Sequence, residues 1–400
     1  ISRLIPNTMH MTSADWMELE ESTQLKTYNK WPVPLVKAQG AWVEDVEGNR
    51  FLDLYGGHCV AFLGHNHPNV VAAIKDQADK ILFYSNAVYA PVRARASKLL
   101  SDLAPEGMDR VFFVNSGAEA NEAAMKMARK ATGRTDIVSV EGDFHGRTLG
   151  ALATTWQAKY RQGYEGSFAP VHFVPFGDAE ATCKVILDVK PAAVIIEPIQ
   201  SMQGMRTAPK SYFQALSAAC KEAGSLLIMD EVQTGIGRTG QFTYSDVLGI
   251  EADMITLAKS LGGGVPVSAV LIRNAVADTV KFGDQGTTFG GGMLAMAAVE
   301  AVLQTVVDED LSAKALSIFD QMVVGCDARG ICYQGAGCLI GIHFGQPVAP
   351  IVVGLRKRGI LVGGSADPQI MRLMPPAVVS AEEIDLFFTH LDDVLEEVKA

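Results

Sequence analysis

The sequence has no excess of positive charge, no closely paired cysteines and no long apolar run, and each absence argues against a class of protein. Its 45 acidic and 34 basic residues give a formal charge of −11, which disfavours a nucleic-acid-binding surface. No run approaches the roughly 18 apolar residues of a membrane span. The six cysteines form no C-x-x-C pair, so we expect reduced thiols. These features predict a cytoplasmic protein that binds neither nucleic acid nor membrane.

The composition is that of an ordinary globular chain. It has 400 residues, of which 48% are hydrophobic, and contains 38 glycines and 17 prolines. The first residues, ISRLIPNTMHMTSADWMELEES, lack an apolar segment followed by a small-residue cleavage site, so we expect no secretion signal in them. The sequence starts at Ile1 and leaves open whether residues precede it. The length fits two or three domains, or one large α/β domain with a smaller one.

Short apolar runs alternate with helical periods through the middle of the chain. The predicted strands are Arg110–Val114, Asp136–Val140, Val171–Pro175, Ala192–Pro198, Ser225–Glu231, Met254–Lys259 and Val267–Ile272. The predicted helices include one whose apolar face carries Ala120, Ala124, Met127, Ala128 and Ala131, one from about Tyr212 to Ala223, and a long one from near Met293. This alternation predicts an α/β fold with a mostly parallel sheet covered by helices on both faces.

After about Val306 the pattern changes to shorter elements and amphipathic helices. Ser380 with Glu383 fits a capping box at the start of the last helix. We therefore expect a large domain over residues 50–300 and a smaller α+β domain built from residues 1–49 and 301–400.

Polar residues follow several of the predicted strands. Ser116, Glu197, Asp230 and Lys259 each stand at or just beyond the carboxyl end of a strand. In parallel α/β sheets, ligands bind at that edge. The sequence therefore predicts a ligand site formed by these residues.

Two of the strand ends have a functional and a structural interpretation. Ser116, Gly117 and Ala118 lead into a helix, where free N–H groups can bind a phosphate, but Ser116 can equally be a simple N-cap. Asp230 ends a buried strand and needs a cationic partner, which a protonated pyridine or a structural salt bridge would provide.

Lys259 lies 29 residues after Asp230, at the end of the next predicted strand. An isolated buried ammonium is costly, and a lysine condensed with a carbonyl cofactor avoids that cost. Pyridoxal 5′-phosphate (PLP) needs such a lysine, a carboxylate for its ring nitrogen and a phosphate cradle. Lys259, Asp230 and Ser116–Ala118 provide all three. The order of these groups along the chain indicates a PLP enzyme.

The sequence also resembles the class III, ω-aminotransferase-like branch of the fold type I PLP enzymes, and within it the acetylornithine aminotransferase group. The similarity covers roughly residues 40 to 380 and is carried by the stretches GHNHPNV, FFVNSGAEANEAAMKMARK, GDFHGRTLGAL, AAVIIEPIQ, LLIMDEVQTGIGRTG, ADMITLAKSLGGGVP, GTTFGG and IMRLMPP. The resemblance implies a large domain with a seven-stranded sheet, a smaller domain and a homodimer with shared active sites.

The resemblance also implies roles for the cofactor site. Lys259 would form the Schiff base and move the proton, while Asp230 would pair with the pyridine nitrogen. Gln233 would hydrogen-bond the phenolic oxygen, and Gly117 with Ala118 would offer N–H groups to the phosphate. Phe144 would lie against the ring; without the motif we would interpret it as core.

Four further residues are implied with plain structural alternatives. Thr288 would reach the phosphate bound by the partner subunit, or is a turn residue. Glu197 would be an acid near the ring, or part of a salt bridge. Arg147 and Arg372 would bind substrate carboxylates, because guanidinium holds carboxylate in two hydrogen bonds. The alternative for Arg372 is a surface ion pair.

Three histidines invite assignments that we do not make. His145 stands beside Phe144, but the lysine already transfers the proton. His65 and His67 resemble a metal pair, yet the resemblance places them in a structural turn, so we predict no metal.

One position departs from the pattern. After EPIQ, related sequences carry a Glu where this chain has Met202, and that Glu can pair with the C-terminal arginine as a switch between two substrates. Met202 cannot do so, which would leave Arg372 free for a carboxylate and make the pocket more apolar.

These observations predict a PLP-dependent aminotransferase that works in ping-pong fashion through pyridoxamine phosphate. It would move an amino group between an amine or ω-amino acid, perhaps acetylornithine-like, and a 2-oxo acid such as 2-oxoglutarate. The alternatives are a related PLP racemase, decarboxylase or aminomutase, and a non-catalytic protein that retains the fold. Intact Lys259, Asp230 and Gln233 argue against the last.

Overall fold

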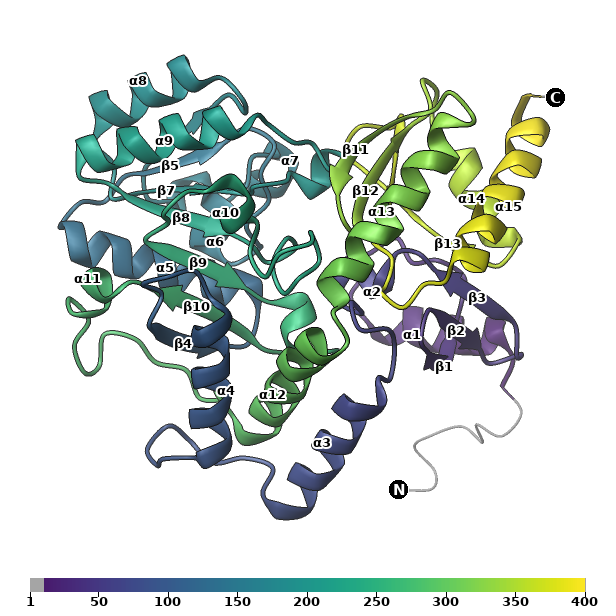
Figure 1. Cartoon of the computed structure of the whole chain (residues 1–400), viewed down its shortest axis with the longest axis horizontal. Coiled ribbons are helices and arrows are strands. Elements are labelled where there is room, and N and C mark those ends of the chain that lie inside the picture. Colours follow the sequence, from purple (N-terminus) through teal and green to yellow (C-terminus); the bar gives the residue numbers. More distant parts are fainter. Residues whose placement is uncertain (1–10, 400) are drawn as a thin grey trace.

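The structure is a computed structural model that describes residues 11–399. The large domain is built on a seven-stranded sheet with the order β4–β10–β9–β8–β7–β5–β6 (Figure 1). Its strands are β4 (Arg110–Val114), β5 (Ile137–Val140), β6 (Val171–Val174), β7 (Ala193–Ile196), β8 (Leu226–Asp230), β9 (Met254–Leu257) and β10 (Ser268–Ile272). The pairs β5–β6, β5–β7, β7–β8 and β8–β9 are parallel, whereas β10 runs antiparallel to both β4 and β9. The predicted strands and the mostly parallel sheet are confirmed.

Alternation along the strands explains why the runs are apolar throughout. In β7, Val194 and Ile196 belong to the main core cluster, while Ala193 and Ile195 belong to a second cluster on the opposite face. Successive side chains of a strand point to opposite faces, so a sheet covered on both sides needs apolar residues at every position.

Helices cover both faces of this sheet. The helices around the sheet are α4 (Pro91–Leu103), α5 (Gly117–Thr132), α6 (Leu149–Ala153), α7 (Ala158–Arg161), α8 (Ala179–Val189), α9 (Lys210–Ala223), α10 (Tyr244–Leu248) and α11 (Asn274–Ala277). α5 contacts β8, β9 and β10 with the apolar face predicted from its alanines, and α8 packs on α9. The predicted helices near residues 120–131 and 212–223 are confirmed.

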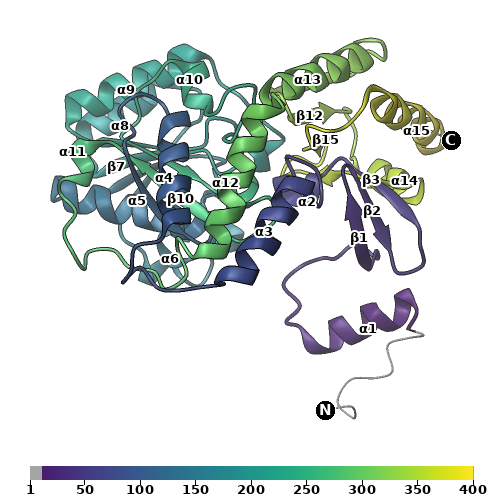
Figure 2. The same ribbon diagram turned by 60° about the horizontal axis from the view of Figure 1, so that its bottom comes forward.

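The small domain joins both ends of the chain (Figures 1 and 2). One sheet has the order β1–β2–β3–β13, from β1 (Leu35–Gln39), β2 (Trp42–Asp45), β3 (Arg50–Asp53) and β13 (Ile360–Leu361). The other has the order β11–β12–β15–β14, from β11 (Cys332–Ala336), β12 (Leu339–His343), β14 (Gly363–Gly364) and β15 (Ile370–Leu373). Because β3 pairs with β2 and β13, the first strands are held by the C-terminal part of the chain. The predicted division at residues 49/50 and 300/301 stays a prediction.

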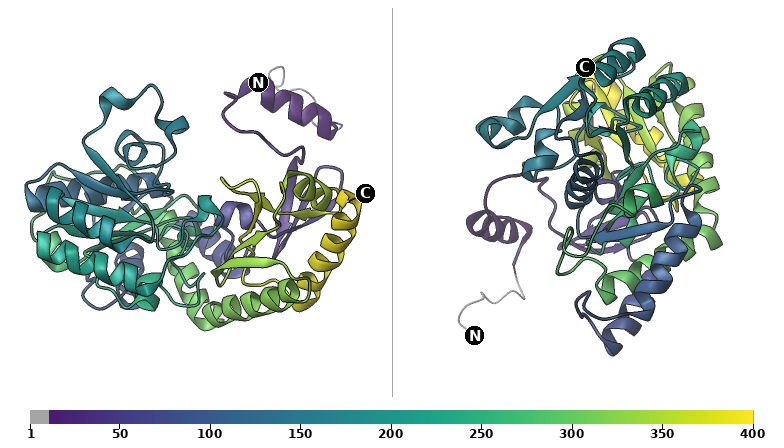
Figure 3. Two further views of the ribbon diagram at one scale, coloured as in Figure 1. Left: turned by 90° about the horizontal axis from the view of Figure 1, so that it is seen from above. Right: turned by 90° about the vertical axis from the view of Figure 1, so that its left-hand side faces the viewer.

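The remaining helices connect and flank the two parts. They are α1 (Ser13–Thr23), α2 (Gly56–Cys59), α3 (Pro68–Lys80), α12 (Met293–Asp308), α13 (Leu311–Asp327), α14 (Ala349–Lys357) and α15 (Ala381–Lys399). α12 packs on α3 and α4 and begins at the predicted residue, Met293. α1 buries none of its residues and stands away from the body of the molecule (Figure 3). The capping box before α15 is confirmed. Ser380 N–H donates to Glu383 Oε2 at 2.8 Å, and Glu383 N–H donates to Ser380 Oγ at 3.2 Å.

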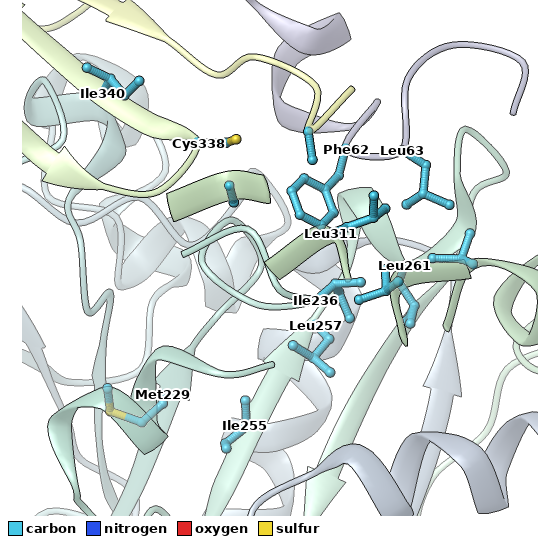
Figure 4. Packing of buried hydrophobic residues seen from close by; sticks show 14 of the residues in the cluster. Phe62, Leu63, Met229, Ile236, Ile255, Leu257, Leu261, Leu311, Cys338 and Ile340 are labelled. Atoms are coloured by element: carbon cyan, nitrogen blue, oxygen red, sulfur yellow. The ribbon is translucent and has the colours of Figure 1, made fainter. Parts of the chain in front are cut away.

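One apolar cluster runs from the large sheet into the small domain. Figure 4 shows side chains of the strands, such as Leu257, next to Ile236 and Leu261, and beyond them Phe62 and Cys338. This continuous core fixes the two parts against each other at the edge where the functional residues gather. No described helix combines the length and the apolar composition needed to cross a membrane.

Candidate active site

A pocket of about 470 Å³ lies where β4, β8 and β9 end. Seven residues predicted for the site line it, namely Ser116, Gly117, Ala118, Phe144, Arg147, Asp230 and Lys259. They come from separate segments of the chain, so the fold brings together what the sequence only places in order. The other four predicted residues, Glu197, Gln233, Thr288 and Arg372, do not line this pocket.

The first turn of α5 forms one end of the pocket. Ser116 is the N-cap, and its Oγ accepts a hydrogen bond from Glu119 N–H at 3.3 Å, so the capping interpretation is confirmed. The N–H groups of Gly117 and Ala118 have no acceptor within the described residues 11–399. A Cβ on Gly117 would lie 3.0 Å from Val232 Cγ1, so the backbone packs closely here. Free N–H groups at the N-terminus of a long helix suit an anion.

Asp230 is held by neutral and cationic donors. Its Oδ2 accepts from Asn121 Nδ2 at 2.8 Å and contacts His145 Nδ1 at 2.7 Å, and its Oδ1 accepts from Val232 N–H at 3.1 Å. Asn121 is itself fixed, because Thr256 Oγ1 donates to its Oδ1 at 2.8 Å. The carboxylate is thus kept in one orientation at the base of the pocket. We call Asn121, His145 and Asp230 the cofactor wall.

His145 is fully buried between two carboxylates. Its Nε2 lies 3.5 Å from Asp143 Oδ2, opposite the contact with Asp230. Burial alone would lower the pKa of this imidazole, but the nearby carboxylates of Asp143 and Asp230 raise it to about 10. His145 is therefore a cation at neutral pH that balances buried negative charge. The sequence predicts no acid-base role for His145 and gives no sign of its contact with Asp230.

Lys259 corrects one structural prediction. β9 ends at Leu257, and Lys259 opens a 3₁₀ turn, η4 (Lys259–Gly262), instead of closing the strand. Its φ of 44° lies in the left-handed region, which non-glycine residues avoid and which costs of order 1–3 kcal/mol. Burial lowers the pKa of its ammonium, which the carboxylates of Asp230 and Glu197 oppose. A strained, partly desolvated lysine fits a nucleophile better than a structural cation.

Glu197 and Phe144 are linked to each other behind the pocket. Phe144 N–H donates to Glu197 Oε1 at 2.7 Å, and Glu197 N–H donates to Asp143 Oδ2 at 3.1 Å. Burial, followed by the charges of Asp143 and Asp230, raises the pKa of Glu197 to about 8. Within the described residues no cation pairs directly with Glu197, so its predicted alternative as half of a salt bridge finds no support.

Gln233 and Thr288 lie outside the pocket lining for different reasons. The Gln233 Oε1 atom is buried and has no hydrogen-bond partner in the described part of the chain, which leaves it able to meet a polar group of a ligand. Thr288 is exposed in the loop before α12, next to Phe289, which is also exposed. The fold therefore does not bring Thr288 into the pocket of its own chain.

Two arginines frame the site. Arg147 is exposed, with its Cζ 3.8 Å from the Tyr160 ring centroid and 5.5 Å from that of Phe144. Arg372 is 4% exposed, so a surface ion pair is wrong for it. It donates to Gly364 O at 2.6 Å and to Ser201 Oγ at 3.2 Å. Among residues 11–399, no carboxylate forms an ion pair with either guanidinium.

Met202 lies beside Arg372, with its Sδ 3.5 Å from Arg372 Nη1. A thioether is a weak acceptor and carries no charge. A buried guanidinium surrounded by carbonyl, hydroxyl and sulfur atoms keeps its full charge available for an anion.

An unusual turn places two residues, Tyr55 and His58, near Arg372, and the sequence did not reveal either of them. Gly56, Gly57, His58 and Cys59 all have positive φ, between 55° and 67°, and form one left-handed turn. His58 Nδ1 lies 2.5 Å from Tyr55 Oη, and Tyr55 lies 6.0 Å from Arg372 Cζ. Partial desolvation, with the charges of Lys259 and Arg372, lowers the pKa of His58 to about 4, although the residue is exposed in this chain. We call Tyr55, His58, Met202 and Arg372 the substrate wall.

The structure gives no grouping of three or more potential metal ligands within residues 11–399. His65 Nε2 contacts Asp53 Oδ2 at 2.8 Å, and His67 Nε2 contacts Glu309 Oε1 at 3.2 Å. The two imidazoles thus have separate carboxylate partners.

The residues present fit PLP. The free N–H groups of Gly117 and Ala118 can take a phosphate, the unpartnered Gln233 Oε1 can meet a ring hydroxyl, and Asp230 can pair with a protonated ring nitrogen. Lys259 stands in the same pocket with a lowered pKa. Each of these features concerns this chain's own atoms, and together they match the needs of that cofactor.

Comparisons with known proteins agree with this chemistry. Residues 23–395 match the family described as aminotransferase class-III. The acetylornithine aminotransferase of Methanopyrus kandleri is 41% identical, covering 95% of this chain and 99% of its own. The solved acetylornithine aminotransferase of Elizabethkingia anophelis has a TM-score of 0.87 at 31% identity, covering 97% of this chain and all of the other. An ornithine aminotransferase of Toxoplasma gondii, with partial occupancy of PLP at its active site, has a TM-score of 0.91 at 30% identity, covering 97% and 95%.

The chain belongs to the class-III aminotransferases. It has the fold of the fold type I PLP enzymes, and it is a PLP-dependent transaminase. The predicted fold, cofactor and reaction type are confirmed, and the racemase, decarboxylase and aminomutase alternatives are not favoured.

Proposed function

We propose that this transaminase takes its amino group from an ω-amino acid that carries an α-carboxylate, of the acetylornithine kind, and passes it to a 2-oxo acid such as 2-oxoglutarate. The observation that carries the proposal is Arg372, a buried cation without a carboxylate partner within residues 11–399. Such a charge is compensated when an anionic substrate binds. The names of the related enzymes support the same substrate class.

The residues divide into binding and proton-transfer roles. When bound, PLP supplies an electron sink that stabilises the carbanion formed at the substrate carbon next to the amine. Lys259 would hold the cofactor aldehyde and then carry the proton from that carbon, a task that its lowered pKa favours. Asp230 would keep the ring nitrogen protonated, with His145 and Asn121 fixing the carboxylate.

Other groups would position the two ligands. Gly117 and Ala118 would bind the phosphate through N–H groups, with Ser116 capping the helix beneath it. Phe144 would cover the ring, held in place through Glu197. Gln233 would meet the phenolic oxygen.

Arg147 and Arg372 would bind substrate carboxylates. Both lack a carboxylate partner in the described chain, and Arg147 is kept at the pocket by the ring of Tyr160. Exclusion of water around a buried guanidinium strengthens such a contact.

We also propose a homodimer located in the cytoplasm. Thr288 is exposed and outside its own pocket, which supports a role at the phosphate of the partner subunit. Exposed apolar side chains lie nearby, including Phe289 at 65% and Leu82 at 58% exposure. Apolar surface of this kind is typical of subunit contacts.

The test is an absorbance titration of the purified holoenzyme with single amines and amino acids. A carboxylate-bearing ω-amino acid alone should convert the visible cofactor band into the pyridoxamine band, because half of the reaction needs no acceptor. Addition of 2-oxoglutarate should restore the first band. A band that persists with every amine, while product chirality or carbon dioxide changes, would instead support the racemase or decarboxylase alternative.

A further inference from the structure

Asp143 is a buried carboxylate to which the proposed reaction gives no role. It follows β5, in the loop that carries Phe144 and His145, and is 0% exposed. Its Oδ1 accepts from Gln200 Nε2 at 2.7 Å, and its Oδ2 accepts from Glu197 N–H at 3.1 Å. Within residues 11–399 its only ion-pair partner is His145, whose Nε2 lies 3.5 Å from Asp143 Oδ2. Burial raises the pKa of the Asp143 carboxyl, and the charge of His145 and these two donors oppose the rise. The carboxylate and the imidazolium therefore stabilise each other.

The ring of His145 lies between two carboxylates. Its Nδ1 lies 2.7 Å from Asp230 Oδ2 on one side, and Asp143 Oδ2 faces its Nε2 on the other. A neutral imidazole has one N–H and one lone pair, so one nitrogen would direct a lone pair at a buried carboxylate oxygen. The doubly protonated ring avoids this repulsion. With Asp230 alone, a neutral ring could donate from Nδ1 and leave Nε2 free. The second carboxylate is therefore what favours the cation.

The main chain keeps the ring in this place. Asn121 Nδ2 donates to His145 O at 2.8 Å, and His145 N–H donates to Thr155 Oγ1 at 3.0 Å. Asp143 O accepts from Trp156 N–H at 2.9 Å. Both residues are thus fixed to the segment that follows α6. Because His145 is only 2% exposed, its ring has no solvent to turn toward.

Other titratable groups face Asp143 and His145 from four places in the fold. They are Asp230 at the end of β8, Glu197 after β7, Tyr212 in α9 and Lys259 in η4. Burial raises the pKa of Glu197 to about 8 and that of Tyr212 to about 12, so both are neutral at pH 7. Burial lowers the pKa of Lys259. The three remaining groups are two carboxylates and one imidazolium, which together leave one negative charge.

We propose that Asp143 is a positioning residue that acts through His145. It keeps the imidazole doubly protonated across the neutral pH range, so that Asp230 accepts from a charged donor while one negative charge remains for the ring nitrogen of the cofactor. The proposal rests on the proposed function, in which Asp230 pairs with that nitrogen. His145 fixes the carboxylate of Asp230, and Asp143 prevents the charge of His145 from cancelling it.

The test is the dissociation constant of PLP, obtained by dialysing the holoenzymes of wild type and Asp143→Asn against graded PLP concentrations between about pH 5.5 and 9. Asparagine keeps the shape and removes the charge, so His145 should titrate between about pH 6 and 8. Below this range the imidazolium cancels Asp230, and the variant should bind PLP about tenfold more weakly than wild type. Above it, the difference should be less than about threefold. An equal weakening at every pH, or none, would overturn the proposal.

His145→Gln shows whether the pH dependence passes through the imidazole. Glutamine does not titrate, so in this background the addition of Asp143→Asn should change the dissociation constant by the same factor at every pH. A pH-dependent difference that survives in His145→Gln would overturn the proposal.

Glu197 is a second carboxylate that could replace the lost charge, because Asp143 is among the causes that raise its pKa. The comparison is therefore repeated with Glu197→Gln in both proteins. The weakening at low pH should then be at least as large as before. If it disappears in this background, the effect belongs to Glu197 and the proposal fails.

Asp136→Asn is the matched control. Asp136 stands at the other end of β5, and its Oδ2 contacts His172 Nε2 at 2.8 Å, so this pair also joins a carboxylate to an imidazole. Its PLP affinity should equal that of wild type at every pH. If Asp143→Asn does not fold, Asp143→Ser removes the same charge with a smaller side chain, and the same pH-dependent weakening is expected. A folded Asp143→Ser protein without it would count against the proposal.

Asp230→Asn separates the two levels of the argument. If it leaves both kcat and the dissociation constant of PLP unchanged, the proposed role of Asp230 fails, whatever Asp143 does. If it changes them while the difference between Asp143→Asn and wild type does not depend on pH, the inference on Asp143 fails alone.

Discussion

The two walls of the site differ in whether the chain itself compensates their main charge. On the cofactor wall, Asp230 is matched by the imidazolium of His145 and the amide of Asn121, so its charge is compensated within the chain. On the substrate wall, Arg372 donates only to two carbonyls, a hydroxyl and a thioether, and the pKa of His58 is lowered. A cofactor that stays bound can thus be held by a carboxylate whose charge the chain already compensates, whereas an anionic substrate that exchanges can bind a cation that the chain leaves uncompensated.

The largest expected effect is at Lys259, which serves both walls. Lys259→Ala should reduce turnover by roughly 1,000-fold or more, because covalent attachment and proton transfer are lost together. It should also abolish the visible absorbance band of the holoenzyme. Rapid-mixing assays and an absorbance spectrum measure both, with far-ultraviolet circular dichroism as the check on folding. Turnover close to that of wild type would contradict the assignment.

The next effect tests the cofactor wall. Asp230→Asn keeps the shape and removes the charge that His145 balances, so kcat should fall roughly 100-fold with a smaller change in KM. Steady-state kinetics with saturating PLP measure the split.

Asp253→Asn is the control for that variant. Asp253 directly precedes β9, at the edge of the sheet away from the pocket, and its Oδ2 accepts from Leu227 N–H at 2.8 Å. Its kcat should stay near that of wild type, and an equal loss in both variants would point to stability instead of catalysis.

A smaller effect is expected from a substitution that makes the substrate wall resemble the cofactor wall. Met202→Glu would place a carboxylate beside Arg372, where it competes with the substrate. We expect KM for carboxylate-bearing donors to rise about tenfold, which corresponds to about 1.4 kcal/mol of lost binding. Met202→Gln has the same length without the charge and should change KM less than about threefold. Equal KM values in the two variants would show that charge compensation is not what matters there.

The last effect concerns stability instead of activity, and is a dependence of stability on pH that comes from Glu197, next to the cofactor wall. Burial, with the charges of Asp143 and Asp230, raises the pKa of Glu197 to about 8, above the ordinary value of 4.5. Between these values the native state binds more protons than the unfolded state, so this group makes stability fall as pH rises from about 4.5 to about 8. Glu197→Gln should remove that part of the slope in denaturant titrations at pH 5 and 8. Parallel slopes for variant and wild type would contradict it.

The sequence predicted the fold and the identity of the cofactor correctly, because both are indicated by local patterns. The apolar runs of β7 and β8 and the Ser116 N-cap are visible one segment at a time, and the order of Asp230 and Lys259 along the chain indicates a shared sheet edge. Their roles as site residues stay predictions that the variants above test.

The contacts that the sequence did not reveal are between distant segments. Asn121 gave one weak signal, a polar residue among the alanines of α5, but its partner Asp230 is 109 residues away. The left-handed turn carries His58 and Cys59 in conformations that their side chains disfavour, so no local preference predicts it. The same holds for Lys259, which was predicted to end a strand and instead opens η4.

The pairing of β3 with β13 has a consequence for synthesis on the ribosome. Leu52 pairs with Ile360, so the parallel partner of an early strand is made about 300 residues later. At roughly 5–20 residues per second, the exposed edge of β3 waits on the order of 15–60 s for its neighbour. During that interval the large sheet can close around its own core, while the nascent N-terminal strands stay open to wrong partners. The sheet that begins first along the chain is therefore completed by a strand that leaves the ribosome long after its neighbours.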